Sequence, residues 1–473
     1  MRKTKLVITM GPAIEEDKKL VEVLKIADVI RINASHSTCE ERTPVVTRIR
    51  EILSELGRTV PIFLDLQGPK WRLGLLEAPV DAPDGSIGHF YSAEREAPTG
   101  AEWAVPVPHP ELFQGAEIDQ TWLVDDGALE FKVTETHGDY VSVKTLAGGA
   151  IKQRKGLMPI GMDVQIDPLT KKDFEDIEWG IKQNVDLFAQ SFIRRASDLA
   201  TLEEAIKSMG GNQPIIAKIE HPKAIENLEP IVAAAWGIMV ARGDLGVELG
   251  VDKVPALQKR IIHTASQYMK PVITATQMLE SMIEHPMPTR AESSDIANAI
   301  WDGTDAVMLS AESAVGKHPL ESIHWLAKIA EDADRHDSIL FKTAQSNLAP
   351  TLTNNIDVNI AFAACCLAKE IGAAYILAFS EVGNIVRMLA HTASGTPIIG
   401  ATTSPVVARR LGIMRNVQSI LTPRAEHLSE LLKLVMPVLR ETFNISPGDK
   451  VVMVAGHPLW VAGQTNMVRV IVF

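Results

Sequence analysis

The residues best suited to chemistry in this chain stand at the ends of short apolar runs. In Ile216–Glu220, the alternation of a strand places Lys218 and Glu220 on one face. A buried lysine and carboxylate are costly unless paired or used, so a structural salt bridge and a reactive pair both remain open. Asp244 follows the next apolar run. Together with Glu220 it offers two carboxylates to a hard divalent cation such as Mg²⁺, which keeps part of its water shell in proteins.

Cationic residues accompany two earlier runs. Arg31 lies in the run 29–33, and Arg72 follows the run that ends at Asp65. A guanidinium group matches the oxygens of a phosphate, although Arg72 taken alone is equally consistent with a surface charge. Thr276 ends a later run, where a helix N-terminus could hold an anion or the threonine could be a plain N-cap. This set suits a phosphorylated or carboxylated substrate with Mg²⁺, without choosing between phosphoryl transfer and enolate chemistry.

Eight apolar runs separated mostly by amphipathic stretches must position these residues. The runs are Leu6–Thr9, Val29–Asn33, Ile62–Asp65, Leu187–Ser191, Ile215–Glu220, Ile238–Arg242, Val272–Thr276 and Ala306–Ser310. Near-continuous apolar strands are typical of a parallel sheet covered on both faces. We therefore predict an α/β fold with a (β/α)₈ TIM barrel, whose chemistry lies at the carboxyl ends of the strands. A doubly wound open sheet is the alternative fold. A helix start is predicted at Ser293–Asp295.

Two segments break this rhythm. Residues 73–155 are first rich in proline and then alternate like strands around turn signals, which predicts a small β domain inserted after the third barrel strand. Such an insertion would hang over the catalytic rim as a lid. Residues 344–473 predict a separate C-terminal α/β regulatory domain. The barrel would then comprise residues 1–72 and 156–343.

Composition narrows the class of protein. The 473 residues are 46% hydrophobic and 22% charged, which suits a soluble globular protein with large cores. With 47 Lys and Arg against 59 Asp and Glu, the net charge of −12 argues against non-specific nucleic-acid binding, although it leaves a local basic patch open. Three cysteines, Cys39, Cys365 and Cys366, form no disulfide framework, and no apolar stretch reaches membrane-spanning length. The start of the chain makes a poor signal peptide. We expect a cytoplasmic protein with neither nucleic-acid nor membrane partners.

The motifs that carry these residues resemble the pyruvate kinase family. The matching segments are Thr4–Pro12, Arg31–His36, Ile216–Glu220, Met239–Gly246 and Lys270–Gly316. The resemblance covers nearly the whole chain, and is strongest over residues 155–321 and weakest over residues 71–121. It implies phosphoryl transfer from phosphoenolpyruvate to ADP, giving pyruvate and ATP, with Mg²⁺ or Mn²⁺ as cofactor. It also implies a homotetramer.

The resemblance implies a role for each matched position. Lys218 would stabilise the moving phosphoryl group and the enolate, and Arg31 would face that phosphoryl group. Thr276 would lie near the pyruvate carboxylate and take part in protonating the enolate. The backbone at Gly243 and Asp244 would contact the same carboxylate. The implied metal ligands are Glu220 and Asp244, and the implied nucleotide-binding residues are Asn33, His36, Arg72 and Lys155.

The chain departs from the family pattern at residues 65–72. The family segment Asp-Thr-Lys-Gly-Pro-Glu-Ile-Arg here reads Asp-Leu-Gln-Gly-Pro-Lys-Trp-Arg. In the family, a monovalent potassium ion would be bound by the positions of Asn33, Ser35, Asp65 and Leu66. Leu66 has no side-chain oxygen, and Lys70 replaces a glutamate. Our hypothesis is that Lys70 supplies the positive charge that potassium otherwise supplies, so that potassium is not required. The alternative is that Lys70 faces solvent.

A second departure concerns regulation. Family members that sense a sugar bisphosphate use a Ser/Thr-rich loop after a strand of the C-terminal domain, whereas residues 379–385 here include Glu381 and Val382. A phosphate site needs donors without a nearby carboxylate, so we predict weak or no activation by fructose 1,6-bisphosphate.

Two other functions compete with a kinase. A lyase or aldolase on a related barrel would share the metal and enolate chemistry but would need no ADP site and no inserted lid. A non-catalytic relative would be expected to lose Lys218, Glu220 or Asp244, and all three are present.

Overall fold

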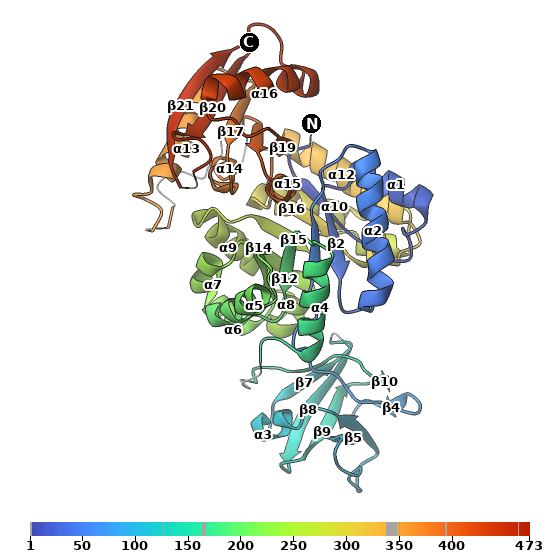
Figure 1. The fold of residues 1–473 in the computed structure, drawn as a ribbon. Helices are drawn as coiled ribbons and strands as arrows, with labels where there is room; N and C mark the ends of the chain where they lie inside the picture. The colour runs from blue at the N-terminus through green and yellow to red at the C-terminus, as the bar shows by residue number, and fades with distance from the viewer. Residues whose placement is uncertain are drawn as a thin grey trace.

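The computed structural model describes residues 2–125, 127–162, 167–336, 348–349, 351–392, 395–461 and 463–473. The boundary predicted between residues 343 and 344 lies outside these ranges. Figure 1 shows three regions stacked in a column, with the barrel in the middle, an inserted sheet below it and the C-terminal sheet above. None of the helices in the described ranges is both long and apolar enough to cross a membrane.

The central region is a closed parallel barrel. Its strands are β1 (Lys5–Thr9), β2 (Val29–Asn33), β3 (Ile62–Asp65), β12 (Leu187–Gln190), β13 (Ile215–Ile219), β14 (Gly237–Ala241), β15 (Val272–Ala275) and β16 (Ala306–Leu309). Their order around the barrel is β1-β16-β15-β14-β13-β12-β3-β2. Because β1 pairs with β16, with Lys5 beside Ala306, the sheet closes on itself. The predicted TIM barrel is confirmed, and the open-sheet alternative is wrong.

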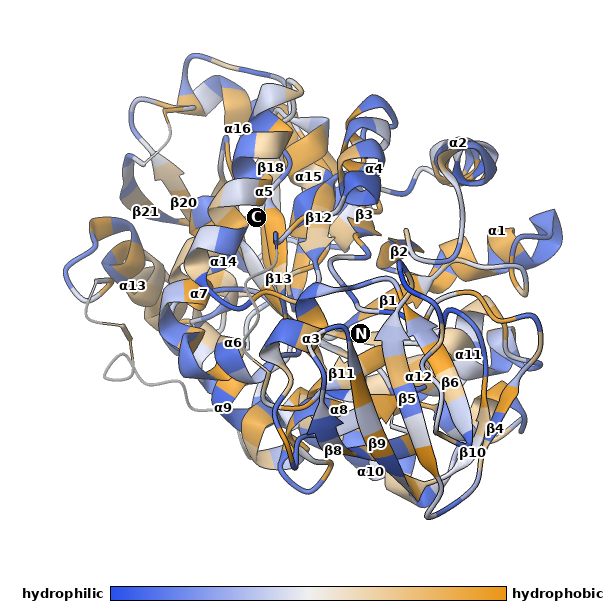
Figure 2. Ribbon diagram, turned by 90° about the horizontal axis from the view of Figure 1, so that it is seen from below, coloured by the Kyte–Doolittle hydropathy of each residue, from blue (hydrophilic) through white to orange (hydrophobic). Residues whose placement is uncertain are grey.

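Helices and short connections surround the barrel. They are α1 (Asp17–Ile26), α2 (Cys39–Glu55), α4 (Lys171–Lys182), α5 (Ala196–Ser208), α6 (Pro222–Glu226), α7 (Leu228–Ala234), α8 (Arg242–Leu249), α9 (Val254–Gln267), the 3₁₀ helix η1 (Glu280–Ile283), α10 (Arg290–Asp302), α11 (Ala311–Ala314) and α12 (Pro319–Arg335). In Figure 2 the buried strand β13 is mostly orange, whereas the outer helix α2 carries much blue. The helix start predicted at Ser293–Asp295 is wrong. α10 begins three residues earlier, because Thr289 and Glu292 form a capping box.

In the described residues between β3 and α4, the chain forms two sheets and one short helix. Its elements are β4 (Val80–Ala82), β5 (Ile87–Ser92), β6 (Trp103–Val107), α3 (Glu111–Gly115), β7 (Thr121–Val124), β8 (Leu129–Thr136), β9 (Tyr140–Ala147), β10 (Gly149–Ile151) and β11 (Leu157–Pro159). The larger sheet has the order β11-β7-β8-β9-β5-β6. The chain leaves and returns side by side, since Leu73 N donates to Lys155 O at 2.9 Å and Leu157 N donates to Trp71 O at 3.0 Å.

The C-terminal region is a five-stranded sheet flanked by helices. It comprises α13 (Ile356–Glu370), β17 (Tyr375–Phe379), α14 (Asn384–Ala390), β18 (Ile398–Thr402), α15 (Pro405–Leu411), β19 (Val417–Leu421), α16 (Leu428–Phe443), β20 (Lys450–Gly456) and β21 (Thr465–Val472). The strand order is β19-β18-β17-β20-β21, and β21 runs antiparallel to β20. The barrel is therefore joined to a second, smaller α/β unit, as the sequence predicts.

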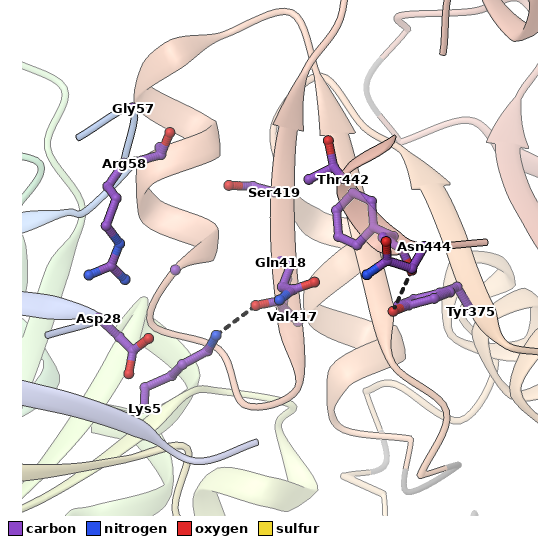
Figure 3. Close-up of a pocket in the computed structure, with 13 residues that line it drawn as sticks. Lys5, Asp28, Gly57, Arg58, Tyr375, Val417, Gln418, Ser419, Thr442 and Asn444 are labelled. Atoms are coloured by element: carbon purple, nitrogen blue, oxygen red, sulfur yellow. Dashed lines mark hydrogen bonds between the residues drawn. The ribbon is translucent and has the colours of Figure 1, made fainter. Parts of the chain in front are cut away.

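A cavity of about 440 Å³ lies between the barrel and this C-terminal sheet (Figure 3). The barrel contributes Lys5, Asp28 and Arg58, and the C-terminal region contributes Ser419 and Asn444 among others. Lys5 begins β1. The cavity therefore lies at the amino end of the barrel strands, opposite the rim at which barrel enzymes do their chemistry.

Candidate active site

Lys218 lies at the centre of the polar group on the carboxyl rim. Its Nζ donates to Ser191 Oγ at 2.7 Å, and it lies 3.3 Å from both Asp65 Oδ1 and Glu220 Oε2. These side chains come from the carboxyl ends of three neighbouring strands, since β3, β12 and β13 pair in that order and Ser191 and Glu220 directly follow β12 and β13. The structural salt bridge left open by the sequence is present, and it forms part of a larger cluster.

The charges of this cluster support one another. Burial by itself disfavours the ammonium form of Lys218, but the carboxylates of Asp65, Glu220 and Asp244 outweigh it and raise the lysine pKa. Burial likewise opposes the carboxylate of Asp65, yet Lys218 and Arg31 hold the pKa of that carboxyl below its usual value. Lys218 is therefore a fixed cation and Asp65 a fixed anion at neutral pH.

Arg31 and His36 lie on the β2 side of the rim. Arg31 Nε donates to Asp65 Oδ2 at 2.8 Å, and its Nη1 donates to Thr9 Oγ1 at 3.0 Å. Burial lowers the pKa of His36, and the charges of Arg31 and Arg72 lower it further. His36 therefore lies within the electrostatic influence of two guanidinium groups, which are suited to phosphate oxygens.

The two predicted metal carboxylates, Glu220 and Asp244, are near enough for their charges to interact. Glu220 is fully buried, and its Oε1 accepts a hydrogen bond from Phe192 N at 2.7 Å. Its Oε2 has no hydrogen-bond partner among the described residues. Burial raises the pKa of Glu220, the charge of Lys218 lowers it, and the nearby charge of Asp244 raises it again. This oxygen is paired with the Lys218 ammonium at 3.3 Å but makes no hydrogen bond among the described residues, and with a second carboxylate nearby it fits a divalent cation.

No group of three or more His, Cys, Asp or Glu side chains gathers at a possible metal site within the described ranges. Mg²⁺ tolerates this arrangement, since it usually takes one or two carboxylates and completes its shell with water and substrate oxygens.

Thr276 is held in a strained backbone conformation. Its φ is 66° and that of Gln277 is 53°, in the left-handed region that residues with a Cβ seldom adopt. Arg242 Nη2 donates to both of their carbonyl oxygens, at 2.7 and 3.1 Å. Gly243 N donates to Thr276 Oγ1 at 2.8 Å. The threonine hydroxyl is thereby fixed beside the start of α8, which carries Asp244.

The helix N-terminus suggested after Thr276 is absent from this part of the described chain. The segment continues into η1, a four-residue 3₁₀ helix, and α10 begins only at Arg290. A short 3₁₀ turn offers little dipole, so an anion here would depend on the Thr276 hydroxyl and the nearby Gly243 backbone.

The residues named for a monovalent site, and Lys70 beside them, have defined surroundings in the structure. Asn33 Oδ1 accepts a hydrogen bond from Ser35 N at 3.0 Å, and Leu66 is buried with 1% of its surface exposed. Lys70 Nζ lies 3.0 Å from Asp244 Oδ1 and 5.9 Å from the centre of the Phe192 ring. The Lys70 ammonium therefore points into the site rather than into solvent.

Arg72 and Lys155 lie where the inserted segment joins the barrel. Arg72 Nη1 donates to Arg154 O at 3.1 Å, and Lys155 Nζ lies 2.7 Å from Asp125 Oδ1. Among the described contacts, Lys155 is engaged by the inserted segment and not by the group around Lys218.

Comparison with known proteins assigns the family. The family model for "Pyruvate kinase, barrel domain" matches residues 1–323, and that for "Pyruvate kinase, alpha/beta domain" matches residues 358–471. The chain belongs to the pyruvate kinase family.

Individual pyruvate kinases support this assignment over the full length. Those of Mycobacterium tuberculosis are 37% identical over 474 residues, covering 99% of this chain and 98% of theirs. That of Thermotoga maritima is 37% identical over 473 residues, covering 100% of this chain and 99% of its own. The crystal structure of a pyruvate kinase from Cryptosporidium parvum superposes with a TM-score of 0.91 at 30% identity, covering 100% and 96% of the two chains. The chain is therefore a kinase of the pyruvate kinase type.

Three side chains at this candidate site were missed by the sequence analysis. Ser191 accepts from Lys218, and Arg242 holds the Thr276 turn. Glu248 lines a small cavity with Lys70 and Phe192, and burial together with the charges of Asp244 and Glu220 raises its pKa to about 8. A signal existed for Glu248, which follows Asp244 by one helical turn, and for Ser191, a polar residue just after a strand.

Proposed function

We propose that this chain transfers the phosphoryl group of phosphoenolpyruvate to ADP and releases pyruvate and ATP. The P–O bond to the enolate oxygen breaks, a P–O bond to the terminal phosphate of ADP forms, and the enolate gains a proton on carbon. The observation that carries the proposal is the position of Lys218 Nζ, 3.3 Å from both Asp65 and Glu220 at the carboxyl rim. A permanent cation there stabilises the negative charge that develops as the phosphoryl group leaves.

The side chains around Lys218 have separate roles toward the substrate. Arg31, oriented by Asp65, faces the phosphoryl group that is being transferred. The hydroxyl of Thr276, held beside Gly243, lies near the substrate carboxylate and takes part in protonating the enolate. The backbone at Gly243 and Asp244 contacts the same carboxylate. These groups bind and orient one substrate in a single reactive position.

Divalent metal belongs to this proposal. Glu220 and Asp244 would hold Mg²⁺ or Mn²⁺, which when bound neutralises charge on the phosphoryl and enolate oxygens. The Oε2 of Glu220, which is ion-paired with Lys218 but makes no hydrogen bond among the described residues, supports this assignment.

We also propose a nucleotide side of the site. It comprises Asn33, His36, Arg72 and Lys155, on the barrel rim and at the junction with the inserted segment. That segment would act as a lid which excludes water, so that ADP and not water receives the phosphoryl group. The pairing of the leaving and returning chains at this junction supports a hinge there.

Potassium independence is the finer part of the proposal. Family members that use potassium would bind it at the positions of Asn33, Ser35, Asp65 and Leu66. Here Leu66 offers no oxygen, and Lys70 brings an ammonium group within 3.0 Å of Asp244. Lys70 then supplies a covalently fixed positive charge in place of the ion. We further propose that the enzyme acts in the cytoplasm as a homotetramer.

One assay tests these points separately. Purified protein is incubated with phosphoenolpyruvate and ADP, and ATP and pyruvate are measured while metal and potassium are omitted in turn. We expect equal amounts of both products, loss of turnover without divalent metal, and little change without potassium. Failure to form ATP with every component present overturns the proposed kinase activity. Pyruvate formed from phosphoenolpyruvate without ADP indicates a lyase instead. Strong stimulation by potassium chloride refutes only the role of Lys70.

A further inference from the structure

The first turn of α4 contacts two loops of the catalytic rim. In Figure 1 one end of α4 lies beside the chain segments that connect the barrel to the inserted sheet. Lys172 and Asp173 are neighbours in this turn, and each bonds to the backbone of a different rim loop. One loop follows β2, and the other follows β3. No role in the reaction follows for either residue from the motifs or from the cluster around Lys218.

Lys172 reaches the loop after β2. Its Nζ donates to Ala34 O at 2.8 Å and lies 2.6 Å from Asp176 Oδ2, one turn further along α4. Asp176 also pairs with Arg42 of α2, whose Nε donates to Thr38 O at 3.0 Å. This buried carboxylate fixes the ammonium of Lys172, which in turn fixes the carbonyl group of Ala34.

Asp173 reaches the loop after β3. It is fully buried, and its Oδ1 accepts from Gly68 N at 3.1 Å. Its Oδ2 accepts from Thr170 N at 2.8 Å and from Thr170 Oγ1 at 2.6 Å, which closes the capping box of α4. One carboxylate therefore both starts the helix and holds the loop that carries Lys70.

Gly68, which bonds to Asp173, is packed closely against Ser191. The φ of Gly68 is +67°, and a Cβ there would lie 3.0 Å from Ser191 Cβ. Ser191 Oγ donates to Leu66 O at 2.7 Å and accepts from Lys218 Nζ at 2.7 Å. A shift of the loop at Gly68 would therefore move Leu66 and Ser191, and with them the hydrogen bond that holds the ammonium of Lys218.

We propose that Lys172 and Asp173 are positioning residues, which set the two rim loops relative to the point where the inserted segment returns to the barrel. This inference deepens the proposed function and rests on it. Lys172 positions the loop after β2, which begins next to Asn33 and carries His36, on the nucleotide side. Asp173 positions the loop that carries Lys70, and through Ser191 it positions Lys218. Because α4 follows the inserted segment in the chain, its first turn links the placement of that segment to the reacting groups.

The Lys172 series tests the nucleotide side. Lys172→Met is expected to raise the KM for ADP about tenfold, the effect of one lost charge-assisted hydrogen bond, while the KM for phosphoenolpyruvate changes by less than about twofold. Lys172→Arg is expected to restore most of the ADP affinity. The matched control is Lys171→Met, at the exposed neighbouring position. Mn²⁺ binding, followed by electron paramagnetic resonance, should be unchanged, because Glu220 and Asp244 are untouched.

The Asp173 series separates positioning from helix stability. Thr170→Ala removes the threonine side chain of the capping box but leaves the bond from Gly68 to Asp173. Asp173→Ala removes both the carboxylate of the capping box and the hydrogen bond from Gly68 N. We expect both variants to lower Tm, but only Asp173→Ala to lower kcat, by about tenfold or more.

Two results overturn the inference: an ADP KM for Lys172→Met equal to that of wild type, or equal kcat values for Thr170→Ala and Asp173→Ala. Should Asp173→Ala not fold, the half-exposed Lys172 carries the test alone. Wild-type turnover reports on the proposed function itself, so a failure of the inference and a failure of the kinase are distinguishable.

Discussion

Lys70 and Asp244 stand 174 residues apart in the chain, yet Lys70 Nζ lies 3.0 Å from Asp244 Oδ1. The contact joins the loop after β3 to the first turn of α8, across the mouth of the barrel. It places a fixed ammonium beside a proposed metal ligand. The side chains are 19% and 27% exposed, so the pair is only partly screened by water. Substitution of Lys70 should therefore change how the enzyme responds to cations.

The first prediction concerns the double variant Lys70→Glu with Leu66→Thr. It removes the fixed charge and supplies a side-chain oxygen at position 66, where the family pattern has threonine. We expect potassium chloride to stimulate this variant by about tenfold or more, equivalent to ~1.4 kcal/mol, and to change wild type by less than about twofold. Rates in tetramethylammonium buffer with and without potassium decide the point. A variant as indifferent to potassium as wild type would contradict the substitution of ion by ammonium.

The second prediction concerns Lys218. Lys218→Met removes the cation from between Asp65 and Glu220 while keeping a side chain of similar length. We expect turnover to fall by about 1,000-fold or more, with Mn²⁺ and ADP binding largely intact, because the charge acts mainly on the transition state. Lys207→Met, in an exposed ion pair with Glu203, is the control. Near-normal turnover of Lys218→Met would remove this residue from the mechanism.

The third prediction concerns the loop after β17. Glu381 accepts from Thr403 Oγ1 at 3.1 Å and lines a small cavity that also contains Asp357. Two carboxylates oppose the binding of a bisphosphate. Titration of fructose 1,6-bisphosphate at subsaturating phosphoenolpyruvate should leave the apparent KM nearly unchanged. A large fall in that KM would show that the site accepts the bisphosphate in spite of these charges.

The fourth prediction concerns the pH dependence of stability at the joint between the barrel and the C-terminal region. His391 Nε2 lies 3.3 Å from Asp305 Oδ2, and its Nδ1 lies 2.8 Å from Arg387 O. Burial opposes the charged imidazole, but Asp305 outweighs burial and raises the pKa of His391. A raised pKa means that the folded state favours the proton. The contribution to stability is complete below the unfolded pKa of about 6.5 and is lost as pH rises through the folded value.

His391→Gln should therefore cost more stability at pH 6 than at pH 9. We expect a loss of about 1.5–3 kcal/mol at pH 6, the range for a polar interaction with a charged group, and a smaller loss at pH 9. Thermal unfolding of both proteins at the two pH values measures the gap, with the exposed His263→Gln as control. A gap independent of pH would show that His391 is neutral in the folded protein.

Local patterns predicted the strands and one important pairing. Apolar runs located the eight barrel strands, because a strand buried on both faces needs little else. The two-residue period placed Lys218 and Glu220 on one face, and the structure has them 3.3 Å apart. The start of α10 was misjudged although Thr289 and Glu292 carry a recognisable capping pattern. That error lay in the interpretation, since the sequence signal was present.

The sequence by itself determined the barrel, its interruptions and the types of residue that stand at the ends of its strands. Which of them meet was decided only by the tertiary structure. Lys70 contacts Asp244 across 174 residues of sequence. Lys218 donates to Ser191 across 27 residues, and Gly68 donates to Asp173 across 105 residues. The reason is that backbone periodicity fixes the direction of a side chain within one strand or helix, whereas distances between elements depend on how the barrel closes and how its loops pack.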